Sequence, residues 1–286
     1  MGNYKIFIKK EEKMIRFTTL VFLCISASVF AEPRVERNVA YGKDERNIMD
    51  IYWDNDFKNA PIVITIHGGG FIAGSKEYCT SDMQKFYKDK GCIVVSPNYR
   101  LVKDGGKTTR EDCVIDVAMA VAWIQENAKK FGGDPNRIVS TGSSAGGYIS
   151  HAIAYNKRWK WPRDAQYKPK KLNVIGWFGD SPYISPQQIK GVRRKTAPAF
   201  ILYGGPTEHP STRDSVGREL QKQFIKKKVW NKFVYVEHMG HCPRQIIFST
   251  SSRDQESYVA YNAFIDMVCF KKGKPTSGDI INVKKK

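Results

Sequence analysis

The sequence predicts an α/β fold, with a doubly wound, mostly parallel sheet of about eight strands. Short β-branched runs alternate with helix-patterned segments from residue 35 to residue 270. Strands that are separated by helices pair in parallel and carry helices on both faces of the sheet. The chain has 286 residues, of which 41% are hydrophobic, so it is long enough and apolar enough to bury a core. Because the sequence shows no internal repeat and no Pro- or Ser-rich linker, we expect one domain over residues 32–270.

The expected strands follow from short apolar runs. Segments 35–41 and 47–53 lie on either side of Gly42-Lys43-Asp44, which predicts a strand pair. Pro61–Ile66 is a β-branched run that ends in glycines, and Cys92–Ser96 is a continuous apolar run typical of a buried strand. The remaining expected strands are 138–141, 173–178, 199–203 and 232–236.

Helices are expected between these strands. Residues 110–130 carry apolar side chains at positions 114, 117, 118, 121 and 124, which is the period of an amphipathic helix. The other expected helices are 81–90, 145–155, 211–227 and 254–270. Residues 271–286 are polar with a basic end, so we expect a disordered tail there.

The N-terminal residues 1–31 have the pattern of a signal peptide. Lys13 and Arg16 precede the uncharged run FTTLVFLCISASVFA, and Glu32-Pro33 follows it. A basic flank, a short apolar stretch and small residues before a cleavage site are the parts of such a signal. Translation then starts at Met1 or at Met14, and the protein is secreted or periplasmic. The alternative is a buried N-terminal helix.

The charge of the chain is strongly positive, with 47 Lys and Arg against 28 Asp and Glu and a net charge of +19. Such a balance suggests an anionic partner, for example an anionic glycan or an envelope surface. No nucleic-acid recognition motif is present, so nucleic acid is not expected as a partner. No uncharged run reaches the roughly 20 residues that a membrane-spanning helix needs, so the protein is not expected to span a membrane.

The cysteine pattern predicts no metal site. Five cysteines follow residue 31, none of them in a CxxC pair, and no histidine lies at zinc-finger spacing. We therefore expect no metal, no other cofactor and at most one or two disulfides. The five are Cys79, Cys92, Cys113, Cys242 and Cys269.

Gly142-Ser143-Ser144-Ala145-Gly146 follows the expected strand 138–141 and opens a helix. A nucleophile on this sharp turn needs a strained backbone, and a glycine two residues to either side lets the strand and the helix pass closely. The N-terminus of the helix adds partial positive charge beside a developing oxyanion. One GxSxG alone is a weak signal.

The second motif, His67-Gly68-Gly69-Gly70, is rarer and also follows an expected strand. Flexible glycines at this place can turn backbone N–H groups towards the carbonyl oxygen of a substrate. A tight turn with a packed imidazole at His67 would be the structural alternative. Both motifs in this order and context favour chemistry.

With these motifs the chain resembles the α/β-hydrolase fold, and within it the HGGG-type carboxylesterases and lipases related to hormone-sensitive lipase, with carbohydrate-esterase and formamidase relatives. The similarity extends to Asn47–Tyr52, Ser96–Arg100 and Gly133–Ile138. The resemblance implies Ser144 as the nucleophile. It also implies an oxyanion hole made by the N–H groups of Gly69, Gly70 and Ala145, with Ser143 as a neighbour only.

The general base is expected after the last strand. His241 fits the family pattern, whereas His238 lies too near the strand end. A neutral imidazole there can take the serine proton and return it to the leaving group. His151 lies inside the nucleophile helix and is interpreted as a packed or solvated residue. His209 lies in the loop expected to hold the acid and is interpreted as an ordinary loop residue.

The acid departs from the family pattern, which usually places an aspartate soon after the seventh strand. Here that loop offers Glu208, and triads with glutamate occur on this fold. Asp214 is the alternative acid, but Ser211–Asp214 has the pattern of a capping box, which gives Asp214 a structural role. Asp116 is interpreted as scaffold.

These observations predict a secreted serine esterase that hydrolyses short-acyl or carbohydrate-linked carboxylic esters through an acyl-enzyme. Too few residues precede His67, or separate strands 173–178 and 199–203, for a large lid, so we expect little or no cap. An open site suits an acylated polysaccharide, with Trp159, Trp161, Trp177 and Tyr183 as candidate sugar-stacking residues. The alternatives are a formamidase-type amidohydrolase and a non-catalytic binding protein on the same fold.

Overall fold

The computed structural model describes residues 34–103, 105–207 and 209–285. The expected signal peptide, residues 1–31, lies outside these residues. Within them no helix is both long and apolar enough to cross a membrane. The five cysteines are free thiols.

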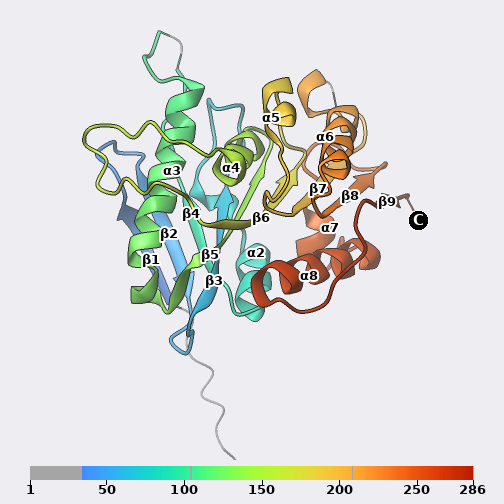
Figure 1. Cartoon of the computed structure of the whole chain (residues 1–286), viewed down its shortest axis with the longest axis horizontal. Helices are drawn as coiled ribbons and strands as arrows, with labels where there is room; N and C mark the ends of the chain where they lie inside the picture. Colours follow the sequence, from blue (N-terminus) through green and yellow to red (C-terminus); the bar gives the residue numbers. More distant parts are fainter. Residues whose placement is uncertain (1–33, 104, 208, 286) are drawn as a thin grey trace, which may run out of the picture. The chain divides into compact units, whose positions relative to one another are not determined.

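One nine-stranded sheet runs through the described chain in the order β1-β2-β4-β3-β5-β6-β7-β8-β9 (Figure 1). β1 pairs antiparallel with β2, β2 pairs antiparallel with β4, and every other neighbouring pair is parallel. This confirms the predicted fold class. The strands are β1 Arg34–Ala40, β2 Ile48–Trp53, β3 Ala60–Ile66, β4 Ile93–Pro97, β5 Gly133–Ser143, β6 Val174–Asp180, β7 Ala199–Gly204, β8 Asn231–Val236 and β9 Ile280–Val283.

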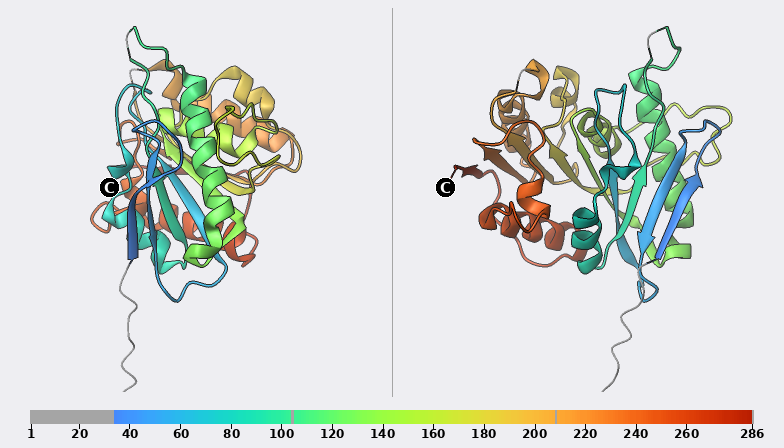
Figure 2. Two further views of the ribbon diagram at one scale, coloured as in Figure 1. Left: turned by 90° about the vertical axis from the view of Figure 1, so that its left-hand side faces the viewer. Right: turned by 180° about the vertical axis from the view of Figure 1, so that it is seen from behind.

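Helices cover both faces of this sheet. On one face α3, α4, α5 and α6 lie side by side, and on the other α2, α7 and α8 pack against one another (Figure 2). This arrangement is the double winding that alternating strands and helices predict. The helices are α2 Ser81–Asp89, α3 Arg110–Asn127, α4 Ala145–Tyr155, α5 Pro186–Gly191, α6 Asp214–Lys226, α7 Gln245–Phe248 and α8 Gln255–Phe270, with short 3₁₀ turns at Lys76–Tyr78, Ala128–Phe131 and Pro210–Thr212.

The core forms two layers because successive side chains of a strand point to opposite faces. In β3, Ile62, Ile64 and Ile66 pack under α3 and α4, while Val63 packs under α2 and α8. All seven residues of β3 are buried. A strand that is apolar on both faces must lie inside a sheet covered on both sides, as the β-branched run predicted.

The C-terminal tail differs from the prediction. Ile280–Val283 forms β9, which pairs in parallel with β8 and buries Ile281 and Val283. Asp279 also forms an ion pair with Lys232 of β8. The polar composition of residues 271–286 hid this strand, because a short edge strand buries only alternate residues and obtains its order from the neighbouring strand.

The parallel strands place six loops along one edge of the sheet. β3 to β8 all run in the same direction, so the segments that follow their carboxyl ends converge there. Between β6 and β7 the only helix is the six-residue α5, in keeping with the expected small cap. A loop without helix or strand, residues 156–173, connects α4 to β6.

Candidate active site

Ser144 sits on the turn between β5 and α4. Its backbone has φ 54° and ψ −118°, a conformation that residues other than glycine rarely adopt. Its N–H donates to the carbonyl of Asp180 (3.1 Å), and its own carbonyl accepts from the Tyr183 N–H (2.9 Å). The end of β6 thus holds the strained turn in place.

Two glycines let this turn, which we call the elbow (residues 142–146), approach the loop after β3. A Cβ on Gly146 would lie 2.3 Å from the carbonyl oxygens of both Ile66 and His67. A Cβ on Gly142 would lie 2.3 Å from the carbonyl oxygen of Gly146. No side chain fits at either position, so the predicted reason for these glycines, close passage of the backbone, is the observed one.

The glycine loop, residues 67–70 after β3, lies against this elbow. Gly69 and Gly70 have φ values of +98° and +63°, in the region that favours glycine. Among the described hydrogen bonds neither of their N–H groups is a donor, and the Ala145 N–H, at the first position of α4, has no intrahelical partner. Three N–H groups are therefore free to bind an oxyanion beside Ser144.

His67 is structural. Its ring is 1% exposed and stacks on Tyr99, with centroids 4.1 Å apart. Burial lowers its pKa to about 4, so the ring is neutral at physiological pH. The Tyr99 hydroxyl donates to the His67 and Gly68 carbonyls at 3.0 and 3.2 Å. The imidazole and the tyrosine together form the floor of the glycine loop.

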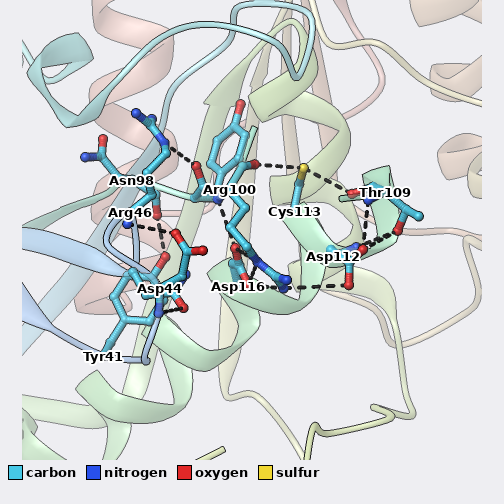
Figure 3. Close-up of polar contacts among 11 residues, drawn as sticks. Tyr41, Asp44, Arg46, Asn98, Arg100, Thr109, Asp112, Cys113 and Asp116 are labelled. Atoms are coloured by element: carbon cyan, nitrogen blue, oxygen red, sulfur yellow. Dashed lines mark hydrogen bonds and ion pairs between the residues drawn. The ribbon is translucent and has the colours of Figure 1, made fainter. Parts of the chain in front are cut away.

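A polar network lies around Arg46, Arg100 and Asp116 (Figure 3). Arg46 donates to the carbonyls of Tyr99 (2.7 Å) and Gly74 (2.8 Å). The guanidinium of Arg100 donates to both carboxylate oxygens of the buried Asp116, at distances down to 2.7 Å. Asp116 therefore has the scaffold role that the sequence predicted.

His241 follows β8 and lines two cavities together with Ser144. Partial burial and the nearby His209 lower its pKa, which keeps the imidazole neutral near pH 7, as a general base requires. The Ser144 and His241 side chains share no hydrogen bond among those described. His238 is exposed and lines neither cavity, whereas His209 lies in one of them.

The two cavities lie on either side of Ser144. One, of about 250 Å³, is lined by Gly70, Phe71, Tyr183 and Arg110 as well as Ser144 and His241. The other, of about 550 Å³, is lined by the glycine loop, Tyr78, Cys242 and Arg244.

Asp180, at the end of β6, connects the elbow with the loop that carries His241. Its carboxylate accepts a hydrogen bond from Ser143 and lies 3.6 Å from the Arg244 guanidinium. The Ser143 hydroxyl is also 2.6 Å from the Tyr78 hydroxyl, and Arg244 lies 4.3 Å above the Tyr78 ring. Sequence reasoning missed this cluster, because its four members come from four separated segments.

Ser181, the next residue, adds a further connection. Its hydroxyl accepts from the Cys242 N–H (3.0 Å) and from the Gly204 N–H (3.4 Å). The strand end thus fastens the residue after His241 and the end of β7 to the elbow. Ser143 is itself held by Tyr78 and Asp180, and its predicted role as a neighbour of the nucleophile stays a prediction.

The acid remains a prediction. Glu208 lies outside the described residues, between Thr207 and His209, which both line the 250 Å³ cavity. The predicted capping box at Ser211–Asp214 is wrong: α6 begins at Asp214, and the N-cap Arg213 makes no side-chain cap. Asp214 instead pairs with Arg218 one turn along the helix (2.8 Å), and it lines neither cavity beside Ser144.

Two other predictions have clear outcomes. Trp177 is fully buried and donates to Ser150, so it cannot stack on a sugar. His151 is 2% exposed and packs against Tyr155 and Trp177, with a pKa lowered by burial to about 3. Over residues 34–285, apart from 104 and 208, no group of three His, Cys, Asp or Glu side chains could hold a metal ion.

The doubly wound sheet, with a strained serine after its central strand and a glycine loop after β3, defines an α/β-hydrolase. The chain belongs to the BD-FAE family, whose model matches residues 49–238.

Several characterised proteins share part of the sequence. An isoprenylcysteine alpha-carbonyl methylesterase of Arabidopsis thaliana is 34% identical over 130 residues, which cover 45% of this chain and 30% of that protein. The probable carboxylic ester hydrolase LipM of Mycobacterium tuberculosis is 32% identical over 136 residues, 46% of this chain and 30% of LipM. The chain spans about a third of the length of these relatives.

A solved structure shares the fold. The butyrate-bound esterase Est2 of Thermogutta terrifontis aligns with a TM-score of 0.68 at 18% identity, over 86% of this chain and 96% of that one. This likeness supports the fold assignment.

The buried Asp180 should make stability depend on pH. Burial raises its pKa from 3.8 to about 6, with Arg244 and Ser143 opposing the shift. Between pH 4 and 6 the unfolded carboxyl loses its proton while the folded one keeps it, so the free energy of unfolding falls as pH rises, by at most about 3 kcal/mol. In Asp180→Asn this contribution should vanish, measured by urea unfolding from pH 4 to 8.

Asp214→Asn, which removes a carboxylate from a helix start, is the matched control and should follow the wild-type profile. If Asp180→Asn follows that profile as well, Asp180 is not the titrating group.

Proposed function

We propose that the protein is a serine hydrolase of carboxylic esters that works through an acyl-enzyme on Ser144. The observation that carries this proposal is the strained serine that lines the same two cavities as His241, one of which Gly69 and Gly70 of the glycine loop also line. The Arabidopsis relative is named a methylesterase and the Mycobacterium relative a probable carboxylic ester hydrolase, which supports ester chemistry here.

In the first step His241 accepts the proton of the Ser144 hydroxyl as the serine oxygen attacks the ester carbonyl. The carbonyl oxygen becomes an oxyanion, which the N–H groups of Gly69, Gly70 and Ala145 and the positive end of α4 stabilise. The carbon–oxygen bond to the alcohol then breaks, and His241 gives its proton to the departing alcohol. Water repeats the sequence on the acyl-enzyme and releases the acid and the free serine.

Open cavities support small acyl groups and bulky alcohols. No large cap helix stands over the described site, and the acyl group has to fit one of two modest cavities. Tyr183 lines the smaller cavity, whereas Trp159 and Trp161, which stack on each other in the loop after α4 (centroids 5.8 Å apart), line neither cavity. We therefore propose short-acyl or carbohydrate-linked esters as substrates, in a protein that is secreted or periplasmic.

Replacing Ser144 tests the chemistry. Ser144→Ala should stay folded and lose esterase activity by about 10⁴-fold or more, because members of a triad act as a unit. Ser143→Ala, the matched neighbour, should keep most of the activity. The measurement is kcat/KM on 4-nitrophenyl acetate, with thermal unfolding as the folding control. Equal losses in both variants would place the nucleophile elsewhere, and activity on formamides alone would favour the amidohydrolase alternative.

Acyl length tests the size of the site. Along acetyl, butyryl, octanoyl and decanoyl esters, kcat/KM should be highest for the short chains, since the site offers little apolar surface to gain about 0.8 kcal/mol per buried CH₂. An optimum at ten carbons would contradict the proposed site.

The acid can be assigned by a pair of variants. Glu208→Gln should lower kcat by orders of magnitude with little change in melting temperature, because an oriented His241 is needed for proton transfer. Asp214→Asn should spare the rate and lower stability by no more than about 1 kcal/mol, the range of a partly exposed ion pair. A dead Asp214→Asn beside an active Glu208→Gln would reverse the assignment.

A further inference from the structure

Arg110 lies in the wall of the smaller cavity beside Ser144 and His241. Its guanidinium carbon is 5.3 Å from the ring centroid of Phe71 and 5.6 Å from that of Tyr183. It also donates a hydrogen bond to the Tyr183 hydroxyl at 3.3 Å. Contacts of this kind between a cation and two aromatic rings hold the guanidinium at the cavity.

Both supports of Arg110 are rigid. Arg110 is the first residue of α3, whose N-terminus is closed by a reciprocal capping box between Thr109 and Asp112 (Figure 3). Phe71 directly follows the glycine loop, is 4% exposed, and has a φ of 69°, which is unusual for an aromatic residue. A strained residue that is kept in place beside a reactive group points to a functional constraint.

The charge of Arg110 is not neutralised within the described residues. Other arginines near the site form ion pairs: Arg100 with Asp116, Arg218 with Asp214 and Arg244 with Asp180. None of the described ion pairs includes Arg110. A guanidinium has five N–H donors, and only one of them donates to a described partner. The remaining donors of this exposed guanidinium have no partner among the described residues.

We propose that Arg110 binds a carboxylate carried by the ester, so that the preferred substrates are acidic esters. This inference rests on the proposed esterase function and narrows it. A guanidinium matches a carboxylate in two parallel hydrogen bonds, while the faces of Phe71 and Tyr183 bind the apolar part of the same molecule. The net charge of +19 also draws anionic esters towards the site.

Two matched ester pairs test the proposal, because the carboxylate can sit on either side of the ester bond. Phenyl acetate and 4-acetoxybenzoate differ by a carboxylate on the alcohol, and ethyl butyrate and monoethyl succinate differ by one on the acyl group. The variants are Arg110→Gln, Arg110→Lys and, as a charge-matched control on the exposed face of α6, Lys222→Gln. The measurement is kcat/KM for every ester at low and at physiological salt.

In at least one pair, Arg110→Gln should lower kcat/KM for the acidic ester about 10- to 100-fold and leave its neutral partner within about twofold, as expected for the loss of a charged hydrogen bond. Arg110→Lys should lose less, since it keeps the charge without the planar fork. Lys222→Gln should resemble the wild type. Salt should weaken the wild-type preference for the acidic ester and have little effect in Arg110→Gln.

Equal losses on acidic and neutral esters would overturn the proposal, because Arg110 would then only hold the aromatic wall. An unchanged acidic-to-neutral ratio in Arg110→Gln would overturn it as well. If the wild type hydrolyses the neutral esters and Arg110→Gln matches the wild type on every ester, the esterase function stands and only this inference is removed. A wild-type protein inactive on all four esters removes both.

Discussion

The contact between Gly146 and the backbone of Ile66 and His67 is the constraint on which the rest of the site depends. It joins the start of α4 to the loop after β3 with no room for a side chain between them. Gly68 makes the reciprocal approach, since a Cβ there would lie 2.9 Å from the carbonyl oxygen of Ser143. Because these backbones touch, Gly69 and Gly70 line the same cavity as Ser144. A site of this kind is built before any substrate arrives, which is what electrostatic stabilisation of an oxyanion requires.

The end of β6 likewise holds the loop that carries His241 against the elbow. Asp180 and Ser181 bind the elbow through the Ser144 N–H and Ser143, and the base loop through Cys242 and Arg244. The cost is a fully buried carboxylate, with one of its oxygens unpartnered among the described residues. Such a cost is tolerated where a unique geometry is needed. The proposed mechanism therefore draws on segments that follow five strands. The buried Asp180 contacts two of these segments, the elbow and the loop that carries His241.

Positive charge is distributed differently around the two cavities. Arg244 faces the larger one with its charge balanced by Asp180 and its guanidinium packed on Tyr78. Arg110 faces the smaller one between two aromatic rings, with no described carboxylate paired to it. The overall charge of +19 had suggested an anionic partner without saying where it would bind. The acidic substrate that we propose would meet positive charge at Arg110, which lines the same cavity as Ser144.

The sequence by itself determined the fold class, the elbow, the glycine loop and the position of the base loop, because each is written in local pattern: β-branched runs, helical period, and glycines at strand ends. It misjudged the tail, where β9 gains its order from β8, and the start of α6, where the helix begins too late for Ser211 to cap it. It left open whether Trp177 stacks on a sugar or packs in the core, because burial depends on neighbouring residues, and the structure buries this side chain. Only the tertiary structure brought Tyr78, Ser143, Asp180 and Arg244 together and set Arg110 between Phe71 and Tyr183. Those contacts join residues far apart in the chain, so no local pattern encodes them. They form because the ends of parallel strands converge at one edge of the sheet.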